Sequence, residues 1–371
     1  MNVLNVITDS NIGGAGLVLV NYYKAADRTK FTHTVVVPRG SLLTERLRAL
    51  DITVIELPDI GESSLNPRAI SAFRRVMCET RPDIVHTHAS MSARIAARLY
   101  GKCKIVYTRH CAYPQSRAKT TFPLKQALGF VNNRLSDRVI AISPAARDNL
   151  TDTGTEPRRI TVMFNGVERV RTVTDEEKAV AQREYGIADG DFVVVMAARF
   201  VAEKGHAYAL DAAARLRGLP IKIVLAGMGP TADEMKSDAA ARELTNIVFA
   251  GFVSDLAPLY NIADAQLNCS YGTETSSLAL LEGMSVGLPS VATDFGGNPF
   301  IVEDGVNGII VQQRDGAAIA DAISRIYGDA ELRKRLGDGA RDAYASRFTC
   351  EIMARNIERV YEDAARVGKG S

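Results

Sequence analysis

Short apolar runs rich in Val, Ile and Thr alternate along the chain with longer segments whose apolar residues recur every three to four positions. The short runs have the length and composition of buried β-strands, and the longer spacing is that of amphipathic helices, as in Ser92–Leu99. In the first half we predict strands at Val3–Ile7, His33–Val37, Thr53–Ile55, Ile84–His86, Ile105–Thr108, Val139–Ile142 and Ile160–Met163.

The alternation pauses at residues 165–174 and then starts again. A strand regularly followed by a helix predicts a parallel sheet with helices on both faces. The sequence therefore predicts an α/β protein with two Rossmann-like halves joined near residues 165–175, a cleft between them, and ligands beyond the carboxyl ends of the strands. The tail from Ala330 to Val367 is predicted to be helical and amphipathic. The strands predicted for the second half are Phe192–Ala197, Ile221–Ala226, Ile247–Ala250, Ala265–Asn268, Ser290–Ala292 and Gly308–Val311.

The stretch from Tyr271 to Asn298 carries two carboxylates, Glu274 and Glu282, separated by seven residues. Its pattern predicts strand, loop, helix and strand, with a serine as the helix N-cap. Glu274 then precedes the helix and Glu282 lies about two turns into it. Amides of Thr275, Ser276 and Ser277 at the helix start would favour an anion such as a phosphate. Taken alone, the spacing is also that of an ordinary capped helix.

Three glycines, Gly13, Gly14 and Gly16, follow the first strand. They allow the backbone to approach a phosphate closely, or they form a tight structural turn. The order of the glycines differs from G-x-G-x-x-G, and no acidic residue ends the second strand, so the signal for a dinucleotide is weak.

Polar side chains also end the fourth and fifth strands, where working residues of such sheets lie. They are His86, His88, Arg109 and His110. A His-x-His pair supplies only two metal ligands, so we expect polar histidines facing the cleft, with His110 the better candidate for a functional group, and no metal.

Two cations, Arg199 and Lys204, follow the first strand of the second half. Five residues apart on a strand-to-helix turn, both can reach one diphosphate, Arg as a fork and Lys as a point charge. Gly227 begins another close-approach turn after the next strand.

Composition places the chain among ordinary globular proteins, with 46% hydrophobic and 24% charged residues. A net charge of +2 gives no reason to expect nucleic acid as a partner. Residues 1–170 hold 24 Lys and Arg against 14 Asp and Glu, whereas the remainder holds 21 against 29. This asymmetry predicts an anionic partner, such as a membrane surface, for the first half, although a scattered surface charge gives the same count. Five cysteines without C-x-x-C, and neither a signal peptide nor a membrane span in the sequence, predict a cytoplasmic protein that is at most peripheral at the inner face of the membrane.

The order of these motifs resembles that of the retaining nucleotide-sugar glycosyltransferases with the GT-B fold, family 4. The matching segments are G-G-A-G, D-I-V-H-T-H, Y-T-R-H, N-G-V, A-R-F-V-A-E-K-G, L-A-G-M-G-P, F-A-G-F-V-S-D and the whole E-T-S-S-L-A-L-L-E-G-M-S-V-G-L-P-S-V-A-T-D-F-G-G-N-P stretch. The resemblance covers nearly the whole chain. It implies an acceptor domain at residues 1–168 joined by a last helix at about 350–371, and a donor domain at residues 169–349.

The resemblance also implies roles for individual residues. Catalytic roles fall on His110, Glu274, Arg199 and Lys204. Donor contacts fall on Gly14, Gly16, Arg199, Lys204, Gly227, Phe252, Val253, Glu274, Thr275, Ser276, Ser277, Leu278 and Glu282. Acceptor contacts fall on Gly14, Ala15, His88 and Arg109.

The expected reaction is transfer of a sugar from a nucleotide diphosphate to an acceptor hydroxyl, with retention and without metal or cofactor. The acceptor is a lipid-linked sugar, a growing polysaccharide or a small molecule, and the reaction is expected in polysaccharide, lipid-linked glycan or glycoconjugate synthesis. Two alternatives share the fold: a nucleotide-sugar 2-epimerase, and a catalytically silent nucleotide-sugar-binding subunit.

Overall fold

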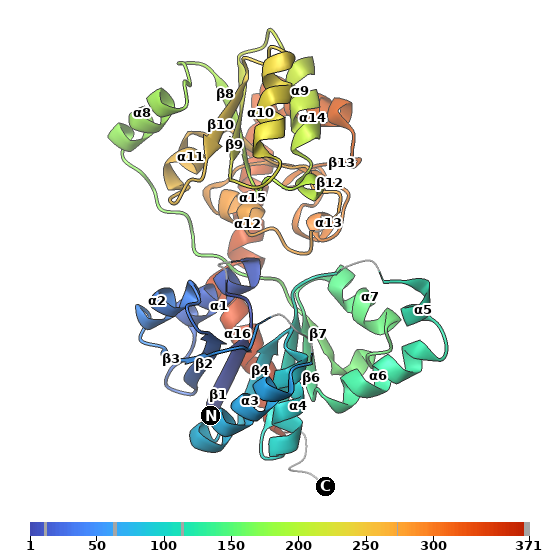
Figure 1. The fold of residues 1–371 in the computed structure, drawn as a ribbon. Coiled ribbons are helices and arrows are strands. Elements are labelled where there is room, and N and C mark those ends of the chain that lie inside the picture. The colour runs from blue at the N-terminus through green and yellow to red at the C-terminus, as the bar shows by residue number, and fades with distance from the viewer. Residues whose placement is uncertain (11–12, 62–64, 113–114, 273, 367–371) are drawn as a thin grey trace. The chain divides into compact units, whose positions relative to one another are not determined.

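The computed structural model describes residues 1–10, 13–61, 65–112, 115–272 and 274–366, which form two compact units (Figure 1). The first unit is Met1–Gly166 together with the chain from Cys350, and the second is Val167–Thr349. Each unit contains one sheet whose strands all pair in parallel. The predicted α/β class with two Rossmann-like units is therefore confirmed.

The first unit is built on a seven-stranded sheet in the order β3-β2-β1-β4-β5-β6-β7. Its strands are β1 (Asn2–Ile7), β2 (Thr32–Pro38), β3 (Thr53–Leu57), β4 (Ile84–His88), β5 (Lys104–Arg109), β6 (Arg138–Ala141) and β7 (Ile160–Val162). Its helices are α1 (Gly14–Ala25), α2 (Leu43–Arg48), α3 (Pro67–Thr80), α4 (Met91–Tyr100), α5 (Arg117–Thr120), α6 (Leu124–Arg134), α7 (Pro144–Asp152), the short η1 (Pro157–Arg159) and α16 (Cys350–Arg366).

The second unit is built on a six-stranded sheet in the order β10-β9-β8-β11-β12-β13. Its strands are β8 (Phe192–Ala197), β9 (Ile221–Ala226), β10 (Ile247–Gly251), β11 (Ala265–Asn268), β12 (Ser290–Thr293) and β13 (Gly308–Val311). Its helices are α8 (Asp175–Glu184), η2 (Ala202–Lys204), α9 (His206–Arg215), α10 (Ala232–Ala241), α11 (Ala257–Ile262), α12 (Leu278–Val286), α13 (Asn298–Ile301), α14 (Gly316–Gly328) and α15 (Ala330–Arg347).

The strand β8, Phe-Val-Val-Val-Met-Ala, is apolar throughout because helices cover both faces of its sheet. In β8, Val194 and Met196 join one core cluster, which also contains residues of α9 and α14. Val193 and Val195 point the other way and join a second cluster with Leu259 of α11. An uninterrupted Val run is thus what a doubly covered strand requires.

Each sheet has a point at which the strand order reverses. In the second unit the chain moves outward from β8 to β10 on one side and then places β11 on the other side of β8. The same happens in the first unit between β1 and β4. Loops at the carboxyl ends of the two strands diverge at such a point and leave a crevice, which is where open α/β sheets bind ligands.

The predicted helical tail is confirmed, and it consists of two helices. The helix α15 ends at Arg347, and α16 begins at Cys350. Between them Phe348 is fully buried and its carbonyl accepts a hydrogen bond from Val167 N at 3.0 Å, while Thr349 bridges to Val167. Helical propensity continues through this segment, but backbone pairing with the linker replaces the helical hydrogen bonds.

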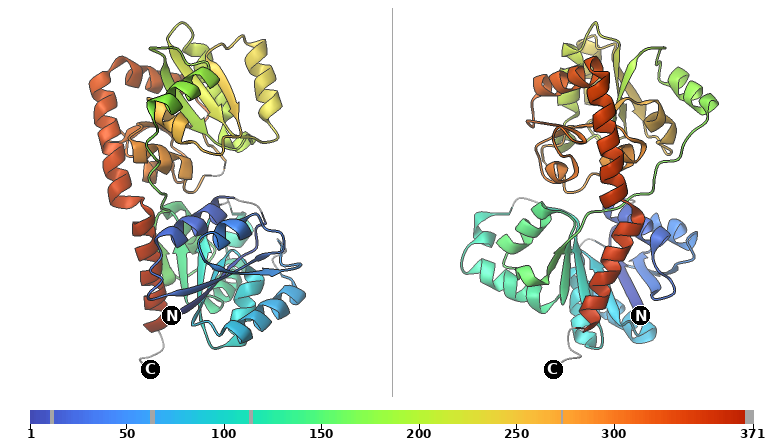
Figure 2. Two further views of the ribbon diagram at one scale, coloured as in Figure 1. Left: turned by 90° about the vertical axis from the view of Figure 1, so that its left-hand side faces the viewer. Right: turned by 180° about the vertical axis from the view of Figure 1, so that it is seen from behind.

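The helix α16 is part of the first unit, where it packs on α1 and β5 (Figure 2). Its fully buried Tyr361 has its ring centroid 5.7 Å from that of Phe31. Glu358 accepts a hydrogen bond from Asp27 N at 2.7 Å. The apolar face of this helix therefore completes the first core.

None of the five cysteines forms a disulfide. Among the described residues, none of the helices combines the length and the hydrophobicity that crossing a bilayer requires.

Candidate functional site

Most residues predicted to bind the donor follow strands of the second sheet. Arg199 follows β8, Gly227 follows β9, Phe252 and Val253 follow β10, and residues 274–278 follow β11. Because the carboxyl ends of parallel strands lie at one edge of a sheet, the fold brings these segments to the same edge. The loops after β8 and β11 flank the reversal of strand order.

The ammonium of Lys204 lies 2.7 Å from Oε2 of Glu274, which joins the loop after β8 to the loop after β11. The side chain of Lys204 is 18% exposed and that of Glu274 is 6% exposed. A pair so little hydrated interacts more strongly than a surface ion pair. Lys204 has three N–H groups, so its ammonium can bond to more than one acceptor at a time.

Two further donors fix the Glu274 carboxylate. Oε2 accepts hydrogen bonds from Asn268 Nδ2 and from Ser270 Oγ, both at 3.2 Å. Asn268 is held in turn by Nδ2 of Asn298, at 3.3 Å from its Oδ1. Asn298 is fully buried and also donates to Thr293 Oγ1 at 3.1 Å. The position of Glu274 thus depends on three loops of the second unit.

Two glycines after β12 clamp the backbone of this segment. A Cβ at Gly296 would lie 1.9 Å from the carbonyl oxygen of Glu274, and one at Gly297 would lie 1.9 Å from that of Thr275. Gly297 N donates to Glu274 O at 3.0 Å. Only a residue without a side chain allows this approach.

Sequence reasoning assigned no role to several of these residues, namely Asn268, Ser270, Gly296, Gly297 and Asn298. Two sequence features mark them: the polar residue Asn268 ends β11, and a Gly-Gly-Asn sequence follows β12. Both features mark close backbone approach or polar contact at a strand end.

The serine N-cap predicted for the helix between the two acids is confirmed as Ser277. Its Oγ accepts a hydrogen bond from Leu280 N at 3.4 Å and opens α12. Thr275 and Ser276 precede the cap, and Leu278 is the first residue of the helix. The hydroxyl of Ser276 is buried and has no hydrogen-bond partner among the described residues. Positive potential at the helix N-terminus therefore faces the segment beside Glu274.

Glu282 lies in the second turn of α12, half-buried, and its Oε2 accepts a hydrogen bond from the Tyr260 hydroxyl at 3.3 Å. The same hydroxyl lies 3.1 Å from Ala279 O, so Glu282 and this carbonyl compete for its single proton. Burial raises the pKa of Glu282 to about 7, although the hydrogen bond from Tyr260 lowers it. The carboxyl group therefore changes its charge near neutral pH.

We expect Glu282→Gln to stabilise the protein more at pH 8 than at pH 5. A raised pKa means that the folded state favours the protonated acid. Protonation of Glu282 therefore contributes fully to the free energy of unfolding below pH 4.5, and this contribution is lost as the pH rises through 7. Glutamine has no charge to bury, so the variant should gain about 2 kcal/mol in free energy of unfolding, relative to wild type, between these pH values. Urea unfolding at both values measures this, with Glu331→Gln on the exposed face of α15 as control. An equal difference at pH 5 and pH 8 would contradict the assignment.

Arg199 is exposed, and its loop touches the loop after β9. A Cβ at Gly227 would lie 2.0 Å from the carbonyl oxygen of Ala198, and Gly227 has φ +148°. The glycine therefore lets the two loops approach closely, as predicted from the sequence. Ala198 N also donates to Ala226 O at 3.0 Å, which extends the β8–β9 pairing up to Arg199.

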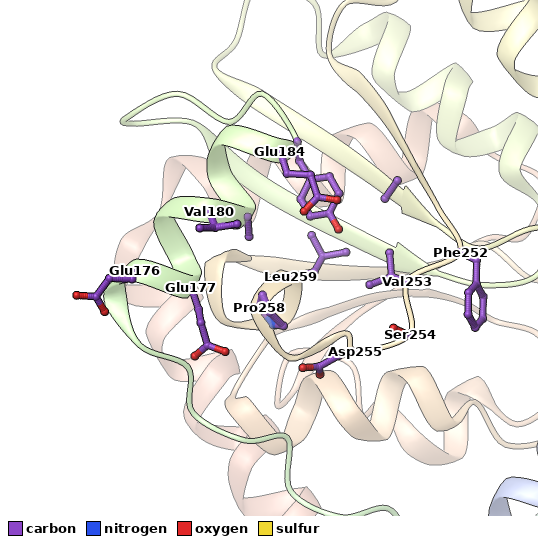
Figure 3. Close-up of a pocket in the computed structure, with 13 residues that line it drawn as sticks. Glu176, Glu177, Val180, Glu184, Phe252, Val253, Ser254, Asp255, Pro258 and Leu259 are labelled. Carbon is purple, nitrogen blue, oxygen red and sulfur yellow. The ribbon is translucent and has the colours of Figure 1, made fainter.

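A cavity of about 440 Å³ lies between α8, α11 and the loop after β10 (Figure 3). Phe252 and Val253 line it, with Phe252 at one end and Glu176 and Glu177 at the other. Its rim also includes Glu184 and Asp255 among the lining residues. Arg171 pairs with Glu177 and Asp255, but four carboxylates outnumber this one cation. The net negative charge makes the cavity unsuited to the phosphates of a nucleotide.

In the first unit, the histidines predicted at the ends of β4 and β5 form a buried hydrogen-bonded series. Nε2 of His110 lies 2.8 Å from Nδ1 of His88, and Nε2 of His88 lies 3.4 Å from Oδ1 of Asn5. His86 is bonded through Nδ1 to the hydroxyl of Tyr361 and through Nε2 to that of Thr108, both at 2.7 Å. His88 thus lies behind His110, and α16 supplies the group that holds His86.

These histidines are neutral at physiological pH. Burial lowers the pKa of His110 to about 4. The pKa of His86 is lowered to about 3, mainly by burial and to a smaller extent by the charges of His110 and His33. Burial also moves the pKa of His88 well below its usual value. Because Asn5 Oδ1 can only accept, the proton of neutral His88 is on Nε2, and Nδ1 of His88 is an acceptor. His110 therefore carries its proton on Nε2, which donates to His88 Nδ1. The other ring nitrogen of His110, Nδ1, is unprotonated and can accept a hydrogen bond. The role of His110 beside a transferred sugar stays a prediction.

The guanidinium of Arg109 is directed at its own unit. It donates to Cys111 O at 2.8 Å and Asn149 Oδ1 at 3.0 Å, and a third nitrogen lies 3.4 Å from the hydroxyl of Tyr107. These contacts hold the chain after β5 against α7. Its predicted contact with the acceptor remains untested.

The predicted glycine loop opens α1, with Gly13 as N-cap. Gly14 is exposed, and a Cβ there would meet no atom within 4 Å, whereas Gly16 is buried and a Cβ would lie 2.8 Å from Leu43. Gly16 therefore allows α1 to pack on α2, and Gly14 with the half-buried Ala15 leaves the helix start open.

Within the second unit, the groups at the carboxyl edge of the sheet suit a ligand with an anionic and a polyhydroxylated part. Lys204, Arg199 and the start of α12 offer positive charge. Glu274 and Glu282 offer acceptors for hydroxyl groups. Among the described residues, no group of three or more His, Cys, Asp or Glu is arranged to hold a metal ion.

Comparison with known families gives two matches that together span most of the chain. The profile described as Glycosyl transferases group 1 matches residues 177–343. The profile described as Glycosyltransferase Family 4 matches residues 12–171. Each match falls almost wholly within one structural unit.

Curated relatives and solved structures agree with these matches. EpsD of Bacillus subtilis is 29% identical over 322 residues, which is 81% of this chain and 82% of EpsD. The glycosyltransferase of Rickettsia africae ESF-5 has a TM-score of 0.85 at 21% identity, covering 100% of this chain and 99% of that one. Anabaena Alr3699/HepE, crystallised with UDP, has a TM-score of 0.84 at 21% identity, covering 98% and 100%; the same protein was also crystallised with UDP-glucose. These neighbours confirm the GT-B fold.

Proposed function

Since the chain belongs to the group 1 glycosyltransferases of the GT-B fold, we propose that it transfers a hexosyl group from a uridine diphosphate sugar to an acceptor hydroxyl. The proposal has three further parts. The configuration at the anomeric carbon is retained, the reaction needs no metal ion, and the acceptor belongs to polysaccharide or lipid-linked glycan synthesis. The observation that carries it is the Lys204–Glu274 pair at the carboxyl edge of the second sheet, beside the start of α12.

Uridine is the proposed base because the Anabaena neighbour was crystallised with UDP and with UDP-glucose. In this proposal the diphosphate contacts Lys204, Arg199 and the N-terminus of α12. Glu282 accepts hydrogen bonds from the ribose hydroxyls, and Glu274 accepts them from the sugar. Its three bonds to Lys204, Asn268 and Ser270 keep the Glu274 carboxylate in place before the donor arrives.

In the proposed reaction the bond between the anomeric carbon and the diphosphate oxygen breaks, and the acceptor oxygen bonds to the same face of the sugar. The proton of the acceptor hydroxyl passes to the departing diphosphate. Negative charge grows on the leaving group as its bond lengthens. Lys204 and Arg199 stabilise that charge, and such fixed electrostatic groups act without rearrangement during the reaction.

The test is turnover of UDP-α-glucose and other UDP-hexoses in buffer containing EDTA, with simple glycosides and polyprenyl-phosphate sugars as acceptors. We expect release of UDP and a new linkage with α configuration by proton NMR. A β-linked product would overturn retention, and loss of activity in EDTA would overturn metal independence. Release of an epimerised nucleotide sugar would instead identify a 2-epimerase.

The proposal also includes contact with an anionic membrane surface by the first unit, which holds the excess of Lys and Arg.

A further inference from the structure

The helix α6 (Leu124–Arg134) in the first unit presents its apolar residues to solvent. Gly129 is its one buried residue. Phe130 is 72% exposed, and Leu124 and Val131 are each 41% exposed. At 100° per residue, Leu124, Ala127 and Val131 lie opposite Gly129, with Phe130 beside them. A surface helix normally buries such a stripe against the core, so this helix is inverted.

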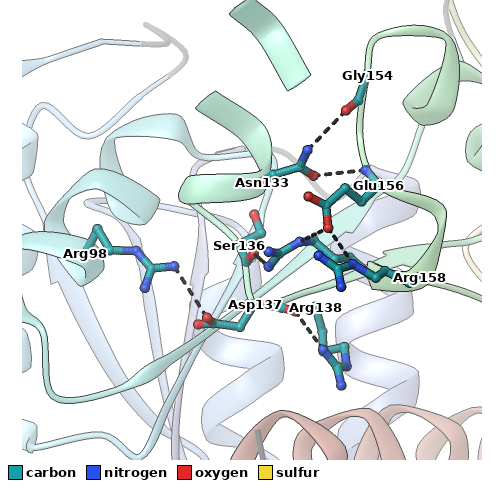
Figure 4. A network of polar contacts seen from close by, with 9 residues as sticks. Arg98, Asn133, Ser136, Asp137, Arg138, Gly154, Glu156 and Arg158 are labelled. Carbon is teal, nitrogen blue, oxygen red and sulfur yellow. Dashed lines mark hydrogen bonds and ion pairs between the residues drawn. The ribbon is translucent and has the colours of Figure 1, made fainter. Parts of the chain in front are cut away.

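The inner side of α6 is held by backbone and polar contacts that leave no room for side chains. A Cβ on Gly129 would lie 2.4 Å from the carbonyl oxygen of Gly154. Asn133 Nδ2 donates to Gly154 O at 3.1 Å, and Glu156 N donates to Asn133 Oδ1 at 3.0 Å (Figure 4). The helix is therefore anchored firmly, and its apolar side faces outward as a consequence of this packing.

The chain immediately before α6 extends the exposed surface. Phe122 is 80% exposed, and α5 (Arg117–Thr120) has no buried residue. Both helices lie at one side of the first unit beside α7 (Figure 1). We define the α5–α6 surface as Arg117, Lys119, Phe122, Leu124, Lys125, Phe130, Val131 and Arg134.

The charge of this surface is predominantly positive. The sequence contains no Asp or Glu between Asp83 and Asp137, so α5 and α6 carry only Lys and Arg as charged residues. Two carboxylates from later in the chain, Asp137 and Glu156, share a hollow with Phe130 and Arg134. Both are paired with arginines, Asp137 with Arg98 and Glu156 with Arg158 and Arg159, so they do not reverse the charge of the surface. Exposed aromatic and aliphatic residues surrounded by Lys and Arg match the apolar boundary and the anionic headgroups of a lipid bilayer.

We propose that the α5–α6 surface binds the protein to anionic phospholipid membranes, with Phe122 and Phe130 inserted at the headgroup boundary. This deepens the membrane contact that is part of the proposed function. Vesicle binding by the protein without substrate measures it separately from sugar transfer, so either result can fail alone. The α5–α6 surface begins at Arg117, a few residues after β5 ends and after His110. The segment that contacts the bilayer therefore follows the carboxyl end of β5 closely in the sequence.

The experiment is flotation of the full chain with vesicles of phosphatidylcholine alone and of equimolar phosphatidylcholine and phosphatidylglycerol. We expect binding to the mixed vesicles only. Phe122→Ser/Phe130→Ser should weaken it by roughly tenfold or more, because the apolar area that enters the bilayer is lost. Leu42→Ser/Leu65→Ser is the matched control, since these leucines are 62% and 66% exposed near α2 and α3 of the same unit, and it should bind like wild type.

A second pair tests the charge. Arg117→Glu/Lys119→Glu should also weaken binding by roughly tenfold or more, and Arg74→Glu/Arg75→Glu on the exposed side of α3 should weaken it less. All substituted residues other than the controls lie on the α5–α6 surface, so thermal midpoints should stay near that of wild type. Absence of wild-type binding to the mixed vesicles would overturn the proposal. The proposal would also be overturned if Phe122→Ser/Phe130→Ser bound the mixed vesicles as tightly as wild type does. Equal losses of vesicle affinity in the two charge-reversal variants would overturn it as well.

Discussion

Lys204→Met is expected to lower kcat/KM for sugar transfer by about 100- to 1,000-fold, the usual effect of losing one electrostatic donor to a leaving group. The substitution removes the ammonium 2.7 Å from Glu274 and leaves that carboxylate buried, with Asn268 and Ser270 as its remaining donors among the described residues. An uncompensated buried carboxylate then opposes a diphosphate nearby, which adds to the loss. Steady-state kinetics with a UDP-hexose measures the effect.

A double variant separates the two contributions. Lys204→Met/Glu274→Gln removes the unpaired charge, so nucleotide affinity should recover toward wild type while transfer stays slow. Lys236→Met on α10, where the lysine is 55% exposed, is the control and should leave kinetics unchanged. Wild-type activity in Lys204→Met, or no recovery of nucleotide affinity in the double variant, would contradict the assigned role of the pair.

Gly297→Ala is expected to lower transfer by about 100-fold, because a displacement near 1 Å at a reacting group typically costs that much. The added methyl group would lie 1.9 Å from the carbonyl oxygen of Thr275, so the segment carrying Glu274 must move. Gly297 has φ −87°, a conformation that alanine adopts readily, so the effect arises from space alone.

Gly328→Ala is the matched control, because a Cβ there meets no atom within 4 Å and no left-handed backbone is involved. It should retain wild-type kinetics. Steady-state kinetics and thermal unfolding are measured for both variants. Slower transfer with an unchanged thermal midpoint indicates displacement of the segment carrying Glu274, whereas a lowered midpoint indicates general destabilisation. Normal activity in Gly297→Ala would show that the segment after β12 does not position Glu274.

The sequence predicts the fold well because its signals are local. A doubly covered parallel strand needs a continuous apolar run, and β8 reads Phe-Val-Val-Val-Met-Ala. The Ser277 cap follows from a hydroxyl residue directly before a helical apolar run. The break between α15 and α16 has no such local signal, since it depends on pairing of Thr349 with Val167, far away in the sequence.

The site is predictable only in part, for the same reason. Strand-end positions identify Arg199, Lys204 and Glu274 as candidates, but nothing local indicates that Lys204 pairs with a carboxylate 70 residues away. Asn298 and Gly297 act through contacts with Asn268 and Thr275 that exist only in the folded unit. The inverted polarity of α6 also becomes visible only when the packing of Gly129 on Gly154 is known.

In the proposed function, the carboxyl edge of the second sheet binds a nucleotide diphosphate through Lys204 without a metal ion. Isothermal titration calorimetry of UDP, in EDTA, with wild type and Lys204→Met tests it most directly. We predict saturable binding by wild type and affinity weaker by about 10- to 100-fold in the variant, as expected for loss of a charge-assisted hydrogen bond. Equal affinities for the two proteins, or binding by wild type only when a divalent cation is added, would contradict the claim.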